Sequence, residues 1–236
     1  MDDALNSYGD IARPTSAGHG MDIASQRADE LDVLAIQSIE ALVAQADGRH
    51  AIHALDVGCG RGGQAARMAK AGARVLAIDI EDCAAQVATT MQDEGVDESA
   101  WAFQQMDIAA IAAIDAIPQI IVCQRMIHYL RYPDALEALR ILRGIAAEGA
   151  MLYLSASGMD TELVDGYQGQ GVDVRERCAM LRHDRAEKHG ITLPVCLYRE
   201  GELAGLVREA GWSVDQVFRS DFGNVKLVAS LEQCKP

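Results

Sequence analysis

Four glycines in one short stretch are the first residues in this sequence whose types and spacing suggest ligand binding. They lie between an apolar run at 51–57 and a stretch of helical periodicity at 64–71: Gly58, Gly60, Gly62 and Gly63. Glycine allows a tight turn and a close approach of the backbone to a ligand, and the first N–H groups of a following helix point at that ligand. The turn therefore predicts a binding site for a small molecule.

Two classes of ligand fit this turn. Gly58, Gly60 and Gly63 satisfy the G-x-G-x-x-G pattern of dinucleotide-binding turns, and Asp79 follows at about the spacing of a ribose-binding carboxylate. Asp56 opposes a dinucleotide, because a carboxylate beside the turn would repel a pyrophosphate and suits a cationic ligand. Each acid also has a purely structural alternative, which is to cap the helix that follows it.

A second group of candidate residues follows the apolar run at 119–124. His128 is our candidate general base, because an imidazole with a pKa near 6.5 exchanges protons at neutral pH. Tyr129 and Arg125 are further catalytic candidates. The structural alternatives are a histidine satisfied by the backbone, a packed tyrosine ring and a surface charge.

Strands and helices alternate around both groups of residues. Apolar runs and helical periodicity predict strands at 51–57, 73–80, 101–106, 119–124 and 150–155, and helices at 21–46, 64–71, a stretch ending near 92, 134–147 and 202–210. This alternation favours an α/β fold with a parallel sheet covered on both faces. Two β-rich runs at 212–219 and 224–231 then predict a C-terminal antiparallel hairpin.

The domain organisation follows from the breaks in this rhythm. We expect an N-terminal arm and helix at 1–50 and one domain at 51–236, with an inserted lid at about 157–198 that exceeds the usual length of a connection. The arm contains three residues that would fold over a substrate: Tyr8, Arg13 and His19. The lid contains a group of cations that would attract an anionic substrate or form a solvated face: Arg175, Arg177, Arg182, Arg185, Lys188 and Arg199.

Composition narrows the function classes. The 236 residues carry a formal net charge of −14 with a pI near 4.7, which disfavours nucleic acid as a partner. The apolar runs are far shorter than the roughly 18 residues of a membrane span, and the acidic start resembles no targeting signal, so we expect a cytoplasmic protein without membrane segments. The six cysteines are scattered without a C-x-x-C pair, which favours reduced thiols and no metal site.

Four features together resemble the class I S-adenosylmethionine-dependent methyltransferases of the small-molecule type. They are the run Leu55-Asp56-Val57-Gly58-Cys59-Gly60-Arg61-Gly62, the acid Asp79 after strand two, Met106-Asp107-Ile108 after strand three, and the closing helix and hairpin at 202–231. The match extends from about Ile52 to Leu231. It implies an α/β/α sandwich with a Rossmann-like, seven-stranded, mostly parallel sheet that ends in an antiparallel hairpin.

The resemblance also implies a role for individual residues in binding S-adenosylmethionine. The methionine moiety would lie against Asp56, Gly58, Cys59, Gly60, Gly62 and Gln124. The ribose hydroxyls would donate to Asp79, and the adenine would contact Ile80, Asp107 and Ile108. For Asp107, a plain turn residue is the structural alternative.

The loop at 123–130 would hold the methyl acceptor in such a protein. It lacks the (N/D/S)-P-P-(Y/F/W) box of the nucleic-acid and glutamine amino-methyltransferases. We therefore expect in-line transfer of a methyl group to O, N or S of a small molecule, with a protein or peptide acceptor left open. Two alternatives remain: an NAD(P)-dependent oxidoreductase built on the same glycine turn, and a non-catalytic S-adenosylmethionine-binding protein.

Overall fold

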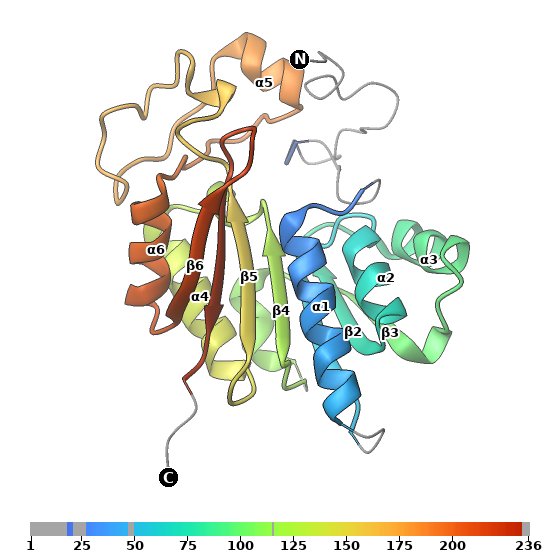
Figure 1. The fold of residues 1–236 in the computed structure, drawn as a ribbon. Coiled ribbons are helices and arrows are strands. Elements are labelled where there is room, and N and C mark those ends of the chain that lie inside the picture. Colours follow the sequence, from blue (N-terminus) through green and yellow to red (C-terminus); the bar gives the residue numbers. More distant parts are fainter. Residues whose placement is uncertain (1–17, 21–26, 47–49, 115, 233–236) are drawn as a thin grey trace.

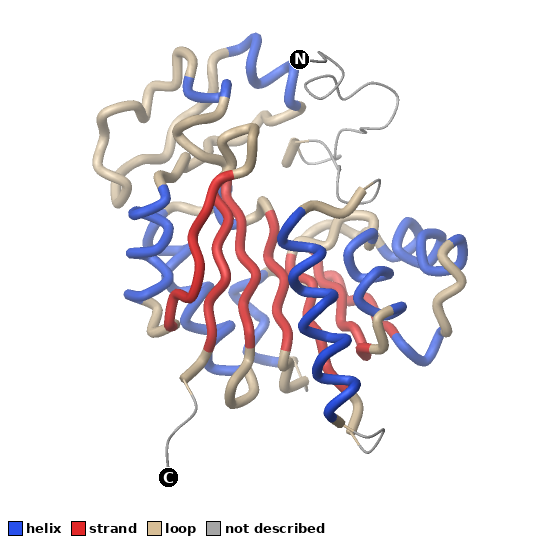
Figure 2. The backbone as a smooth tube through the Cα atoms, viewed as in Figure 1, coloured by secondary structure: helices blue, strands red, loops and turns tan. Residues whose placement is uncertain are grey.

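A seven-stranded sheet forms the centre of the molecule (Figures 1 and 2). The computed structural model describes residues 18–20, 27–46, 50–114 and 116–232. The strands are β1 (Ile52–Val57), β2 (Ala73–Asp79), β3 (Trp101–Gln105), β4 (Ile120–Gln124), β5 (Met151–Ala156), β6 (Ser213–Arg219) and β7 (Val225–Ser230). Their order is β3-β2-β1-β4-β5-β7-β6, and only the pairings of β7 are antiparallel. The predicted mostly parallel sheet with a C-terminal hairpin is confirmed.

Helices cover both faces of the sheet. They are α1 (Glu30–Gln45), α2 (Gly63–Lys70), α3 (Ala84–Asp93), α4 (Tyr132–Ile145), α5 (His183–His189) and α6 (Glu200–Glu209). Side chains alternate between the faces of a strand: in β4, Ile120 and Val122 pack with α1, α2 and α3, whereas Ile121 and Cys123 pack with α4 and α6. Figure 1 shows α1 in front of the sheet and α4 behind it. The molecule is therefore an α/β/α sandwich.

Helix α1 begins later than the sequence pattern predicts. Of the predicted helix at 21–46, residues 21–26 lie outside the described part of the chain, and 27–29 are not helical. Asp29 is the N-cap: its side chain accepts from the N–H groups of Leu31 and Asp32, and the Asp32 side chain accepts from Asp29 N at 2.8 Å. This reciprocal capping fixes the start of the helix, and hydrophobic periodicity does not detect it.

The segment at 157–198 lies beyond the carboxyl ends of the strands (Figure 1). It contains α5, a short 3₁₀ helix (Glu162–Val164) and a small apolar cluster of its own, which includes Leu163, Tyr167 and Val195. This placement brings the segment to the sheet edge where the glycine turn lies. Its function as a lid stays a prediction.

Among the described helices, none is long and apolar enough to span a membrane.

Candidate functional site

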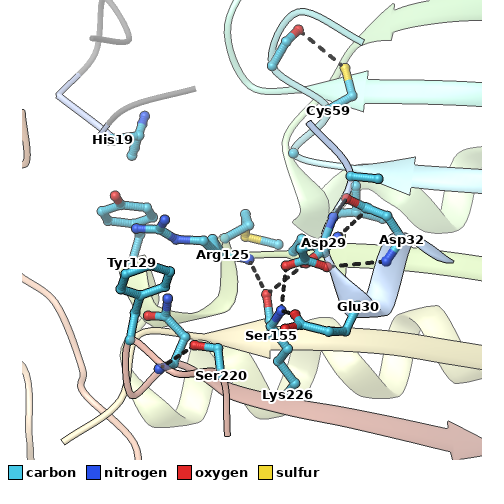
Figure 3. A pocket seen from close by; sticks show the side chains of 18 of the residues that line it. His19, Asp29, Glu30, Asp32, Cys59, Arg125, Tyr129, Ser155, Ser220 and Lys226 are labelled. Atoms are coloured by element: carbon cyan, nitrogen blue, oxygen red, sulfur yellow. Dashed lines mark hydrogen bonds and ion pairs between the residues drawn. The ribbon is translucent and has the colours of Figure 1, made fainter. Parts of the chain in front are cut away.

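A large cleft opens at the carboxyl ends of the parallel strands. Its volume is about 2280 Å³, whereas a pocket for one small molecule usually has roughly 300–1,000 Å³. The lining comes from the glycine turn, the first turns of α1, the loop after β4, the β6–β7 hairpin and the segment at 157–198. Figure 3 shows the part of the cleft between His19 and Lys226. The cleft has room for two ligands side by side.

The glycine turn is anchored to strand β2. Gly58 and Cys59 donate their N–H groups to the carbonyl oxygen of Ile78 at 2.9 and 3.0 Å. Gly58, Gly60 and Gly62 have positive φ values of 72°, 52° and 82°, which favour glycine. A Cβ at Gly58 would lie 3.0 Å from the Met126 side chain. The turn thus lies directly against the loop that follows β4.

The cleft reaches some of the predicted turn residues and not others. Gly58, Cys59 and Gly60 line it, but Gly62 does not. A Cβ at Gly62 would lie 3.1 Å from the Val87 side chain on α3. Gly62 therefore serves close packing between helices, and its direct contact with a ligand stays a prediction.

Asp79 and Ile80 present a carboxylate and an apolar side chain at the end of β2. Asp79 Oδ2 accepts from Gly60 N at 2.9 Å, and its Oδ1 accepts from Glu81 N at 3.0 Å. Ile80 is 55% exposed, although it is a large apolar residue, and both residues line the cleft. The alternative role of Asp79 as a helix cap is not observed, because Cys83 is the N-cap of α3. Their surfaces are available to a ligand with hydroxyl groups and a flat apolar part.

Asp107 combines a structural role with a place in the cleft. Its Oδ1 accepts from Ala109 N at 2.9 Å and so caps the 3₁₀ helix Ile108–Ala113. Asp107 and Ile108 both line the cleft. The structural alternative for Asp107, a role in the turn, is thus observed. A contact between Asp107 and adenine stays a prediction.

Asp56 lies beneath the glycine turn and not on the described cleft surface. It is 4% exposed, and its Oδ2 has no hydrogen-bond partner among the described residues. Burial, and next the nearby carboxylate of Asp32, raises the pKa of Asp56 to about 7. The described cleft lining does not include Asp56, so a direct contact between Asp56 and a ligand stays a prediction, although its carboxyl group lies close to the turn.

Asp32 on α1 is a cleft residue that the sequence interpretation missed. Burial and the carboxylate of Asp29 raise the pKa of Asp32 to about 6. Its Oδ1 accepts a hydrogen bond from Gln124 Nε2, and it lines the cleft together with Gln124. The sequence did contain a signal for Asp32: an acid three residues after Asp29 is typical of a capped helix start.

A row of polar side chains crosses three neighbouring strands below the first turn of α1. Gln124, Ser155 and Lys226 are partners in register on β4, β5 and β7. Lys226 is 3% exposed and forms ion pairs with Asp29, at 2.8 Å, and with Glu30 (Figure 3). The row ties the start of α1 to the sheet and forms a polar floor in the cleft. It depends on strand register, so no single segment of the sequence reveals it.

His128 does not lie in the cleft where we expected it. It is fully buried in the 3₁₀ helix Ile127–Tyr129, and its Nε2 lies 3.4 Å from Ser157 Oγ. Burial, and to a smaller extent the charges of Arg125 and His19, lowers the pKa of His128 well below its usual value. The structure thus favours the alternative of a satisfied, neutral histidine, and a general-base role for His128 stays an untested prediction.

Tyr129 and Arg125, the other catalytic candidates, do line the cleft. The Tyr129 ring lies 4.2 Å from the His128 ring and 4.8 Å from the His19 ring. His19 is the described member of the predicted arm group, since Tyr8 and Arg13 lie outside the described residues. Arg125 adjoins the polar row, because its backbone N–H donates to Ser155 Oγ at 3.1 Å, whereas His19 and Tyr129 lie farther from Lys226 (Figure 3).

The cations at 175–199 are engaged in ion pairs. Arg182 and Arg185 pair with Asp165, Lys188 pairs with Glu162, and Arg177 pairs with Glu202. The remaining two pair as Arg175–Glu209 and Arg199–Glu202. Of this group only Lys188 lines the cleft. The pairing favours a structural role for these charges over attraction of a substrate.

Comparison with known proteins finds methyltransferases. Residues 54–149 match the family model described as Methyltransferase domain. The ubiquinone biosynthesis O-methyltransferase of Nitrosospira multiformis is 26% identical over 183 residues, which cover 76% of this chain and 70% of that protein.

Solved structures of methyltransferases share the fold, and two of them serve as examples. The magnesium protoporphyrin IX methyltransferase of Synechocystis, with bound S-adenosylhomocysteine, has a TM-score of 0.58 at 16% identity and covers 84% of this chain and 81% of its own. The 1,6-didemethyltoxoflavin-N1-methyltransferase of Burkholderia thailandensis, with bound 1,6-didemethyltoxoflavin and S-adenosylhomocysteine, has a TM-score of 0.56 at 16% identity and covers 84% and 79%. At these identities the likeness concerns the fold.

Proposed function

Because residues 54–149 match a methyltransferase domain, we propose that this chain is an S-adenosylmethionine-dependent methyltransferase whose cleft holds S-adenosylmethionine beside a small-molecule acceptor and transfers a methyl group to O, N or S of that acceptor. The observation that carries this proposal is the group of carboxylates around the glycine turn. Asp32, Asp56 and Asp79 lie close enough together for the charges of Asp32 and Asp79 to raise the pKa of Asp56. Such a site attracts a cation and repels a diphosphate.

The residues at the turn fit the cofactor. Asp79 lines the cleft with carboxylate lone pairs remaining after its two backbone hydrogen bonds, and these suit two ribose hydroxyls. The exposed side chain of Ile80 offers an apolar surface to adenine, with Asp107 and Ile108 on the same side. Gln124 offers an amide to the methionine ammonium group, and the buried carboxylate of Asp32, which accepts from Gln124, lies behind it.

When bound, the cofactor supplies an activated methyl group on a positively charged sulfur. The protein's own residues then align the acceptor and keep water out, because the displacement needs little further chemistry. The tight contact between Gly58 and Met126 holds the cofactor turn against the loop that carries Arg125 and Tyr129. Those two side chains face the cleft and orient the acceptor.

A turnover experiment tests the proposed function. The purified protein is incubated with S-adenosylmethionine carrying a deuterated methyl group and a panel of phenols, carboxylic acids, amines, thiols and short peptides, and the products are identified by mass spectrometry. We expect S-adenosylhomocysteine and a labelled product with at least one small molecule. Binding of S-adenosylmethionine without transfer to any acceptor would support the non-catalytic alternative instead.

Binding of S-adenosylmethionine is expected to release protons at pH 6 and almost none at pH 8. The raised pKa values of Asp56, about 7, and Asp32, about 6, mean that at pH 6 most of the Asp56 carboxyls and about half of the Asp32 carboxyls carry a proton. A cation stabilises the carboxylates and lowers both pKa values, so the protons leave on binding. Calorimetry in two buffers of different ionisation enthalpy measures this release. S-Adenosylhomocysteine, which lacks the charged sulfur, should release fewer protons, and equal release at both pH values would contradict the prediction.

We also propose that the enzyme works in the cytoplasm, without nucleic-acid or membrane partners. The cysteines in the described part of the chain are free thiols, as is usual in a reducing compartment: Cys59, Cys83, Cys123, Cys178 and Cys196. Cys234 lies outside the described residues.

A further inference from the structure

Arg125 has an unusual backbone conformation at the edge of the cleft. Its φ of 53° is the one positive value among the non-glycine residues that the structure describes. A residue with a Cβ adopts this conformation at a cost, and proteins retain it where the surrounding structure enforces it, often at ligand sites. Here the Arg125 N–H lies 3.0 Å from the Ser155 carbonyl oxygen and 3.1 Å from Ser155 Oγ. Strand β5 thus holds the turn that directs the Arg125 side chain.

The charge of Arg125 is not neutralised by an ion pair within the described part of the chain. The other cations of the cleft include Lys188 and Lys226, which form ion pairs with Glu162 and with Asp29 and Glu30. Arg125 is half-buried, lines the cleft and has no carboxylate within 4.0 Å among the described residues. A guanidinium group has five N–H donors in a fork that matches a carboxylate. These N–H donors therefore favour a ligand that carries an oxyanion.

The residues around Arg125 also bear on the kind of ligand that it binds. After burial, the charge of Arg125 is the largest influence that lowers the pKa of His128, and it also lowers that of His189. The charge of Arg125 thus reaches both histidines and disfavours their protonated forms. Tyr129 lines the same cleft and offers an aromatic ring there.

We propose that Arg125 binds a carboxylate or a similar oxyanion of the methyl acceptor, so that this enzyme takes acidic small molecules with an apolar or aromatic body. This inference rests on the proposed function, because it takes Asp32, Gln124 and Asp79 as the residues that hold the cofactor and leaves the Arg125 side chain to the acceptor. The methionine carboxylate of the cofactor has the same chemistry as the proposed ligand group. The test must therefore distinguish these two sources.

The test compares benzoate with benzamide, which have nearly the same shape but differ in charge. Each is titrated calorimetrically into the protein, with and without saturating S-adenosylhomocysteine. We expect benzoate to bind the wild type about tenfold more tightly than benzamide, and Arg125→Gln to lose this preference while its affinity for S-adenosylhomocysteine stays within twofold. Arg140→Gln is the matched control, because Arg140 is an exposed arginine on α4 outside the cleft lining.

A second variant separates recognition from structure. Glycine adopts a positive φ without strain, so Arg125→Gly should keep or raise the melting temperature and still lose the preference for benzoate. A wild type that binds benzoate no better than benzamide, or that binds neither, overturns the proposal. So does an Arg125→Gln variant that loses affinity for S-adenosylhomocysteine but keeps the preference for benzoate, since Arg125 would then bind the cofactor. Failure of the wild type to bind S-adenosylhomocysteine counts against the proposed function, and the titrations without it still test Arg125.

Discussion

Replacing Asp79 with alanine is expected to weaken the binding of S-adenosylhomocysteine about 100-fold. The carboxylate lies at the end of β2, lines the cleft and is oriented by hydrogen bonds from the backbone N–H groups of Gly60 and Glu81. Two hydrogen bonds from ribose hydroxyls to a charged group contribute about 3 kcal/mol together, and each 1.4 kcal/mol is about a factor of ten in affinity. Isothermal titration calorimetry measures the change directly.

Asp97 provides the control for this variant. It is an exposed acid outside the cleft lining, and like Asp107 it caps a short 3₁₀ helix, here Glu98–Ala100. Asp97→Ala should leave the affinity for S-adenosylhomocysteine unchanged. If Asp79→Ala also bound with unchanged affinity, the assignment of Asp79 to the ribose would be wrong.

Replacing Arg177 with alanine is expected to lower the free energy of unfolding by about 3–5 kcal/mol. The Arg177 side chain is 2% exposed. It donates to both carboxylate oxygens of Glu202 at 2.7 and 2.8 Å and to the carbonyl oxygens of Val172 and Leu197. Its loss leaves these acceptors without a partner and detaches the segment at 157–198 from α6. Urea denaturation followed by circular dichroism measures the effect.

Arg182 in the same segment is the matched control. It also pairs with two carboxylates, those of Asp165 and Asp184, but its side chain is 43% exposed. Water replaces such contacts readily, so Arg182→Ala should destabilise the protein much less. Equal losses for the two variants would show that burial of Arg177 is not what holds the segment.

The fold was predictable because its signals are local. The apolar run before Gly58, the glycines themselves and the turn between β6 and β7 each identify an element from a few adjacent residues. The start of α1 was missed because the Asp29 cap, and not a change in hydrophobicity, determines where this helix begins.

The candidate site was predictable only in part. Asp79 and Ile80 follow directly after a strand, so their position at the sheet edge follows from the sequence. Lys226 lies in a run that reads as an ordinary strand, and only its register with Ser155 brings it to the cleft. His128 shows the opposite case, because one turn of 3₁₀ helix directs its ring into the protein while Tyr129 faces the cleft. Side-chain direction after a strand depends on tertiary packing that the residue types do not encode locally.

The central claim is that the glycine turn accepts a positively charged sulfur nucleoside and not a dinucleotide. Calorimetric titration of the purified protein with S-adenosylmethionine, NADH and NADPH, under identical conditions, tests this claim most directly. The account predicts binding of one S-adenosylmethionine per chain and no detectable binding of either dinucleotide. Binding of NADH or NADPH without binding of S-adenosylmethionine would contradict it.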